Sequence, residues 1–160
     1  MNISEITEKL KRNKLLRNKK EINGFEEALM ELNEINNVKI IGDLCKGFDD
    51  NTKEYEIMYN VLHAVEDYEG EGAYIELLKI TPYMIENDAK EWSKRLHRRI
   101  LNHSQERIEY IKALKKMDTS IQNIIIKLIH DINNDGKKWL NNEEQKKFEN
   151  ITNEVLNELR

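Results

Sequence analysis

The chain has 160 residues, of which 39% are hydrophobic and 35% charged, with a formal net charge of −4 at pH 7. This balance is typical of a folded helical protein and argues against a disordered one. One proline and six glycines are too few for the tight turns of an all-β fold. The single cysteine, Cys45, has no partner for an internal disulfide and lies in an apolar pattern, which predicts a buried core residue.

Length predicts a single helical domain over residues 1–160. Within it, the basic residues 1–22 form an N-terminal helix that is either part of the core or peripheral to it. No apolar stretch has the length of a membrane span, and the first residues lack the basic and apolar regions of a secretory signal. We therefore expect a cytoplasmic protein that does not bind membranes.

Apolar residues at helical spacing define the elements of the first half of the chain. The predicted helices are residues 3–20, 25–35, 38–48 and 53–68. The Asn23-Gly24 pair separates the first two helices, and Gly47 closes the third. Two asparagines stand three residues before a glutamate, which is the spacing of a helix-capping pair: Asn2 with Glu5, and Asn51 with Glu54.

The second half continues the pattern with helices over residues 74–80, 82–103, 104–114, 118–132 and 141–159. Thr81-Pro82 predicts a helix restart, with Thr as N-cap and Pro at the first helical position. Asn133–Gly136 is expected to end the isoleucine-rich helix, which we expect to be the most buried. Caps are predicted at Ser104, at Asp118, and at Asn141 with Glu144.

Long helices thus begin near residues 52, 82 and 118, roughly one αα-hairpin repeat apart, with a short helix between each pair. The predicted fold is all-α, an irregular HEAT-like stack of antiparallel αα-hairpins. A compact helical bundle is the alternative.

Charge is segregated along the chain. Residues 1–20 carry seven basic and two acidic residues, residues 43–76 carry two basic and ten acidic residues, and residues 90–116 carry nine basic and three acidic residues. These blocks either neutralise one another within the fold or leave a negative face that steers a basic partner. The overall negative charge and the few aromatic residues among the basic ones argue against nucleic-acid binding.

Candidate catalytic and metal sites are weak. Residues 131–136 match the first half of an EF-hand loop, but Asn142 stands where a carboxylate is needed, so we interpret them as a helix-ending turn. The four histidines lack metal-binding spacing, and no serine, phosphate loop or carboxylate pair has a catalytic setting. The sequence predicts a protein that is not an enzyme and binds no metal or cofactor.

Arg99 falls near Trp92 and Leu96, toward the apolar side of its predicted helix. Its guanidinium either reaches solvent at the helix edge or pairs with a buried acid.

Several patches resemble a known family: residues 44–52, 56–59 and 63–66, and later residues 89–92 and 96–102. Together they resemble the immunity protein 30 family of bacterial polymorphic toxin systems, over roughly residues 25–133. The resemblance implies a cytoplasmic, mostly helical antidote that binds a cognate toxin domain. It also implies that the toxin is, in many such systems, a basic nuclease. A helical adaptor unrelated to toxins is the alternative.

The expected partner surface is the polar side of the helix over residues 53–68. Tyr55, Met58, Leu62 and Val65 are expected to face the core, with Tyr59 at the boundary as an aromatic anchor. The opposite side and the turn before it give the predicted partner-binding residues: Asp49, Asp50, Glu56, Tyr59, Asn60, His63 and Asp67.

Overall fold

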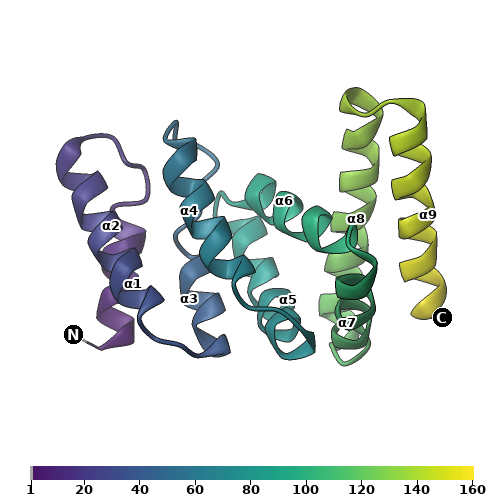
Figure 1. The fold of residues 1–160 in the computed structure, drawn as a ribbon, viewed down its shortest axis with the longest axis horizontal. Coiled ribbons are helices and arrows are strands. Elements are labelled where there is room, and N and C mark those ends of the chain that lie inside the picture. Colours follow the sequence, from purple (N-terminus) through teal and green to yellow (C-terminus); the bar gives the residue numbers. More distant parts are fainter. Residues whose placement is uncertain (1) are drawn as a thin grey trace.

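The computed structural model describes residues 2–160, and these are helical without a strand. The elements are α1 (Ile3–Arg12), α2 (Lys19–Asn33), the 3-10 turn η1 (Val38–Ile40), α3 (Ile41–Cys45), α4 (Tyr55–Glu66), α5 (Glu71–Glu86), α6 (Lys90–Leu101), α7 (Ser104–Lys115), α8 (Thr119–Trp139) and α9 (Asn142–Glu158). Figure 1 shows them stacked in a row that follows the chain, with α1 and α2 at one end and α8 and α9 at the other. The all-α prediction is confirmed.

The outer ends of the stack are antiparallel hairpins, α1 with α2 and α8 with α9 (Figure 1). Between them, α6 crosses the stack from α4 toward α7 and α8. Buried apolar side chains from all ten elements form one core cluster that runs the length of the row. The arrangement is a helical stack, as predicted, although no helix begins near residue 82: α5 begins at Glu71 and α6 at Lys90.

Local capping chemistry sets several helix starts. The side chains of Asn2, Asp118 and Asn141 accept hydrogen bonds from backbone N–H groups three residues ahead, at 2.9, 2.9 and 2.8 Å. These three predicted caps are confirmed. The predicted cap at Ser104 is wrong, because Ser104 is already the first residue of α7 and His103 precedes it without a side-chain cap bond.

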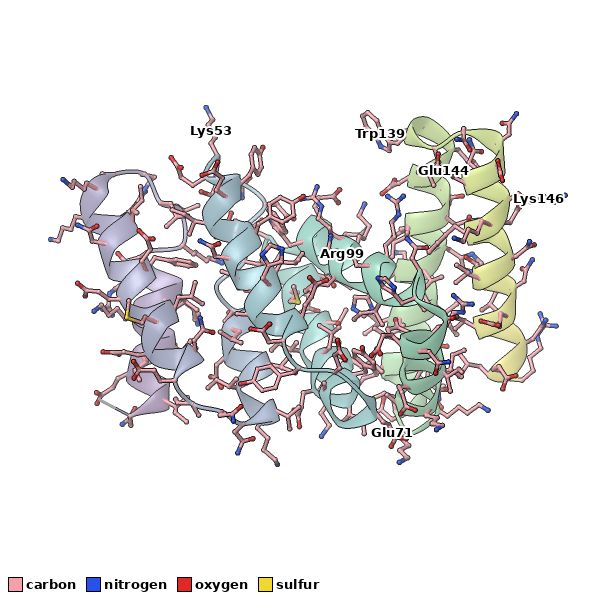
Figure 2. The ribbon with its side chains drawn as sticks, in the orientation of Figure 1. Lys53, Glu71, Arg99, Trp139, Glu144 and Lys146 are labelled. Atoms are coloured by element: carbon pink, nitrogen blue, oxygen red, sulfur yellow. The ribbon has the colours of Figure 1, made fainter. Side chains whose placement is uncertain are left out.

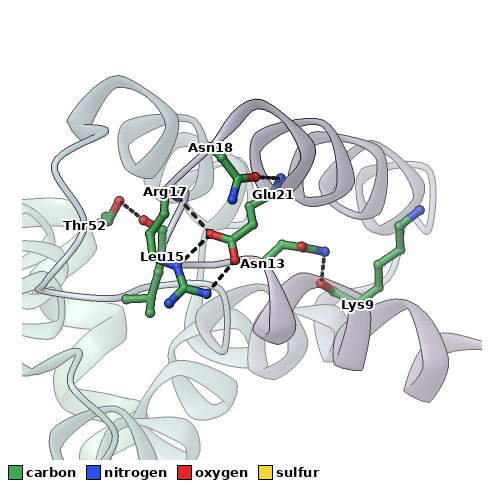
Figure 3. Close-up of polar contacts among 7 residues, drawn as sticks. All are labelled: Lys9, Asn13, Leu15, Arg17, Asn18, Glu21 and Thr52. Atoms are coloured by element: carbon green, nitrogen blue, oxygen red, sulfur yellow. Dashed lines mark hydrogen bonds and ion pairs between the residues drawn. The ribbon is translucent and has the colours of Figure 1, made fainter.

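The start of α2 was predicted too late. Asn18 is its N-cap and accepts from the Glu21 N–H at 2.9 Å, so Asn23 and Gly24 lie inside the helix (Figure 3). The guanidinium of Arg17 also binds the Glu21 carboxylate through two N–H groups, at 3.0 and 2.7 Å. A strong local start signal outweighs the roughly 1 kcal/mol that an internal glycine costs.

The connection between α1 and α2 is tied to the turn before α4. The Thr52 hydroxyl donates to the Leu15 carbonyl at 3.0 Å (Figure 3), and Lys14 Nζ lies 3.3 Å from the Asp49 carboxylate. Leu10 of α1 packs closely on the backbone of Gly47, just after α3. A side chain at this position would clash, because its Cβ would lie 2.8 Å from Leu10. The basic N-terminal segment is therefore anchored to the acidic block.

Two predicted helix ends are wrong. α5 continues through Pro82 to Glu86, and the chain turns at Asp88, whose φ is 58°. α8 likewise continues through Asn133–Gly136 to Trp139. In α5 the Thr81 hydroxyl bonds the Leu77 carbonyl instead of capping a new helix. Pro82 and Gly136 are unfavourable inside isolated helices. In the fold, contacts with α6 hold both regions: Thr81 bonds His97, and Asp135 pairs with Lys94.

The prediction that the isoleucine-rich helix is the most buried is also wrong. Ile121, Ile124 and Ile126 of α8 are half-buried, because α8 lies near the end of the stack. The central helix α6 is buried along half its length, through Trp92, Ser93, Leu96, His97, Ile100 and Leu101.

A buried hydrogen-bonded chain joins α5, α6 and α7. His97 is fully buried, with Nε2 2.9 Å from the Thr81 hydroxyl and Nδ1 2.6 Å from the Tyr110 hydroxyl. Since the Thr81 hydrogen is used on the Leu77 carbonyl, Thr81 accepts from Nε2–H and Tyr110 donates to Nδ1. This assigns a neutral imidazole, and burial lowers the pKa of His97 from 6.5 to about 3.

Candidate partner-binding surface

The two aspartates before α4 are engaged within the fold. Asp49 is 3% exposed, pairs with Lys14 and accepts from the Asn51 N–H at 2.8 Å. The Asp50 carboxylate accepts from the N–H groups of Glu91 and Trp92 at 3.0 and 3.2 Å. Both aspartates therefore have a structural role within the fold.

Asp50 thus caps α6 rather than the helix that follows it in sequence. The Ala89 position at the start of α6 has no side chain able to cap, so the carboxylate comes from a loop about 40 residues earlier. Burial raises the pKa of the Asp50 carboxyl although two backbone N–H groups donate to it. The predicted capping of α4 by Asn51 is wrong, because α4 begins at Tyr55 without a side-chain cap bond.

The outer side of α4 keeps the predicted polar strip. Glu56, Asn60, His63 and Asp67 are all exposed, and neither Glu56 nor Asp67 forms an ion pair with any residue in 2–160. We call these four residues the acidic strip. Spacings of four, three and four place them on one helix side, while Met58, Val61, Leu62, Ala64 and Val65 of the same helix are buried.

Of the two tyrosines of α4, Tyr59 lies at the expected boundary position and Tyr55 does not lie in the core. Tyr55 is 58% exposed, so its assignment to the core is wrong. Tyr59 is half-buried: its ring meets Trp92 edge-on at 5.2 Å between centroids and lies 5.5 Å below the guanidinium of Arg95. Tyr59 is held by α6 and borders the acidic strip, with His63 6.2 Å away. A preorganised ring of this kind loses little conformational entropy when it meets a partner.

Arg99 joins α6 to the end of α4. Its guanidinium binds the Glu66 carboxylate through two N–H groups, at 2.6 and 3.0 Å. The side chains of Arg99 and Glu66 are 46% and 25% exposed, so the pair lies at the surface and the buried-pair alternative is wrong.

We expect Arg99→Ala to lower the free energy of unfolding by less than about 1 kcal/mol, because solvent screens an exposed pair. Urea unfolding followed by circular dichroism measures the change. A loss of about 3 kcal/mol or more, the range of a broken buried pair, would contradict this placement.

A hollow of about 210 Å³ lies beneath this pair, between the end of α4 and helices α5, α6 and α7. Four of its polar side chains are paired with one another: Glu66 binds Arg99, and the Tyr74 hydroxyl binds the Glu106 carboxylate. Burial raises the pKa of the Tyr74 hydroxyl well above its ordinary value.

The EF-hand-like residues 131–136 do not form a metal-binding loop, because they lie within α8. Asp131 and Asp135 pair instead with Lys90 and Lys94 of α6, the first at 3.0 Å. Residues 2–160 contain no group of three His, Cys, Asp or Glu side chains that could hold a metal ion. Within the same residues, no helix combines the length and apolar character that crossing a membrane requires.

The predicted surface missed three residues that line one hollow together with Tyr59: Arg95, Arg98 and Trp139. Arg95 and Arg98 were part of the basic block, and nothing in their spacing distinguished them from a solvated helix side. Trp139 follows Lys137 and Lys138, and a tryptophan in so polar a stretch was the one signal that could have found it.

The comparisons with known proteins identify the family of the chain. Residues 12–110 match the family described as Immunity protein 30. The match covers α2 to α6 and most of α7, and includes the acidic strip and the Asp50 cap. No curated protein matches the chain, and no solved structure matches it. Because the matched residues make up more than half of the sequence, the chain belongs to the immunity protein 30 family.

Proposed function

We propose that this protein binds a cognate bacterial toxin domain and neutralises it by covering its surface. Family membership supports an immunity role, and the observation that supports a docking site is the acidic strip on α4. Five of the other acids in residues 43–76 are used within the fold: Asp43 by Thr7, Asp49 by Lys14, Asp50 by α6, Glu66 by Arg99, and Glu71 by Lys116. Glu54 and Glu69, just before and just after α4, are exposed and add to the negative charge at this side of the molecule. Glu56 and Asp67 remain exposed and uncompensated.

The negative charge of Glu56 and Asp67 on the outer side of α4 favours rapid association with a basic partner. Exposed carboxylates on one helix side create a negative potential that accelerates association at low salt. Tyr59 supplies an adjacent aromatic contact of the type that dominates binding energy in protein interfaces. The acidic strip with Tyr59 is therefore the docking site that we propose for a basic surface of the toxin, which includes basic nuclease domains.

We expect the double variant Glu56→Lys, Asp67→Lys to associate with the toxin domain roughly tenfold more slowly at low salt, with a flatter dependence on ionic strength. The partner to use is the toxin domain encoded by the adjacent gene, and stopped-flow fluorescence gives the rates. Folding should be unaffected because both side chains are exposed.

A matched control is Glu26→Lys, Glu31→Lys on α2. These two glutamates are also exposed and form no ion pair within residues 2–160, so the net charge changes equally. Equal slowing of both double variants would reduce the effect to overall charge and reject the acidic strip as the docking site.

The alternative, an adaptor unrelated to toxins, is distinguished by co-expression. An immunity protein should make the product of the adjacent toxin gene non-lethal and copurify with it. Survival without a complex, or lethality in the presence of a folded chain, would reject the immunity role for that pair.

A further inference from the structure

A second surface lies beside the acidic strip. A hollow of about 400 Å³ opens between α4, α6 and α8. Its lining combines basic and aromatic side chains, and we call this set the arginine groove: Tyr59, Arg95, Arg98, Arg99 and Trp139. Figure 2 shows Trp139 at the upper end of α8, on the side toward α4, and Arg99 near the middle of the molecule. Tyr59 belongs to the groove and borders the acidic strip, so the two surfaces are continuous.

Lysine–aspartate pairs in register join α6 to α8, and the second of these pairs lines the groove. Lys90 pairs with Asp131, and four residues further along each helix Lys94 pairs with Asp135. The same step of four leads to Arg98 on α6 and Trp139 on α8, and both line the groove. At this third position α8 carries an indole in place of a carboxylate, so the series of ion pairs ends where the groove opens.

Two guanidiniums of the groove are therefore not paired with a carboxylate. Neither Arg95 nor Arg98 forms an ion pair with a residue in 2–160. Arg95 is held over the rings of Trp92 and Tyr59, at 4.6 and 5.5 Å, which leaves its N–H edge for hydrogen bonding. Arg98 is half-buried and also lines an adjoining hollow, together with one acidic and one basic side chain, Glu144 and Lys147. Planar guanidiniums of this kind bind carboxylates through two parallel hydrogen bonds.

Trp139 adds an apolar contact at the rim. Its side chain is 81% exposed, the largest exposure among the bulky apolar residues of the described chain. Tryptophan, tyrosine and arginine are the three residue types most enriched among residues that dominate interface energies, and the groove contains all three. An exposed indole beside uncompensated arginines is typical of a recognition surface rather than of a solvated helix.

We propose that the arginine groove receives an acidic segment of the toxin domain, whose carboxylates bind Arg95 and Arg98 while an apolar neighbour packs on Trp139. This inference rests on the proposed function, because the toxin is the partner. The acidic strip and the groove then form one surface with both signs of charge. Adjacent patches of opposite sign fix the orientation of a partner and disfavour partners with the wrong charge order.

A phosphate backbone fits this surface less well than a carboxylate segment. Glu91 and Asp135 also line the groove, and the acidic strip lies next to it, so a polyanion that extended beyond the groove would be repelled. Only two basic side chains of the groove, Arg95 and Arg98, are not in an ion pair. Stable electrostatic binding of nucleic acid uses several phosphate contacts.

The test measures the affinity of the toxin domain from the adjacent gene for the full chain and for two variants, Arg98→Glu and Trp139→Ala. We expect each variant to raise Kd tenfold or more, and Arg98→Lys to raise it less because the charge is retained. In the unmodified chain, acrylamide quenching of tryptophan fluorescence should decrease when the toxin binds. The other tryptophan, Trp92, is 3% exposed, so this signal reports on Trp139.

Matched controls are Lys20→Glu on α2 and Ile108→Ala on α7, which change an exposed lysine without an ion pair and an exposed apolar residue away from the groove. A complex that forms with unchanged Kd for both groove variants would overturn the groove and leave the immunity role intact. The absence of any complex with the unmodified chain would overturn both. Loss of duplex DNA or RNA binding in Arg98→Glu, with toxin affinity unchanged, would assign the groove to nucleic acid instead.

Discussion

Trp92→Ala is expected to lower the free energy of unfolding by about 3 to 5 kcal/mol, the range for truncating a large buried aromatic residue. Trp92 is 3% exposed and stacks on Phe48, with centroids 5.6 Å apart and planes 17° from parallel. Tyr59 and Arg95 pack on its remaining ring surfaces, at 5.2 and 4.6 Å. The cavity left by the indole would therefore lie where α3, α4 and α6 meet.

The same change should weaken toxin binding beyond its effect on folding, because Trp92 positions Tyr59 and Arg95. Urea unfolding measures stability, and binding is measured well below the unfolding midpoint. Trp139→Ala is a matched control, since it removes the same side chain from an exposed position and should change stability by less than about 0.5 kcal/mol. Equal losses of stability for the two variants would contradict the core role of Trp92.

Acidification from pH 7 to pH 5 is expected to remove about 2 kcal/mol of stability through His97 alone. Burial lowers the pKa of native His97 from 6.5 to about 3. The unfolded chain takes up a proton on this imidazole below about pH 6.5, whereas the native state stays neutral until about pH 3. Unfolding is therefore favoured progressively as the pH falls, and the contribution is complete only above pH 6.5.

Urea unfolding at pH 7 and pH 5 measures this loss for the unmodified chain and for His97→Gln. The variant lacks the titrating ring, so its difference between the two pH values should be smaller by about 2 kcal/mol. Proton NMR of the native protein gives an independent measurement: the ring signals of His97 should not shift between pH 7 and pH 4. A midpoint for His97 near pH 6 would contradict the neutral buried imidazole.

Sequence periodicity was sufficient for the fold class and for most helices. Apolar residues at spacings of three and four identify a helix because the buried side must recur every turn. Caps at Asn2, Asp118 and Asn141 were predictable for the same local reason, since each side chain bonds an N–H only three residues away. The exposed side of α4, with Glu56, Asn60, His63 and Asp67, also followed from the helical period.

Errors occurred where a distant partner decides the outcome. Pro82 and Asn133–Gly136 are strong local break signals, yet α5 and α8 continue through them. Asp131 and Asp135 had the spacing of calcium ligands, but in the fold they face Lys90 and Lys94 of another helix. Asp50 was predicted to bind a partner, and in the fold it caps α6, which begins 40 residues later.

The sequence by itself determined that this protein is a helical stack with an acidic outer side on α4, because helix formation and amphipathicity depend on residues three or four apart. Tertiary structure alone decided which charges are neutralised and which remain. Lys14 pairs with the buried Asp49 and Glu66 pairs with Arg99, whereas Arg95 and Arg98, in the same hollow as Trp139, form no ion pair. Ion pairing depends on distances of a few ångströms between helices, and no spacing along the chain encodes those distances.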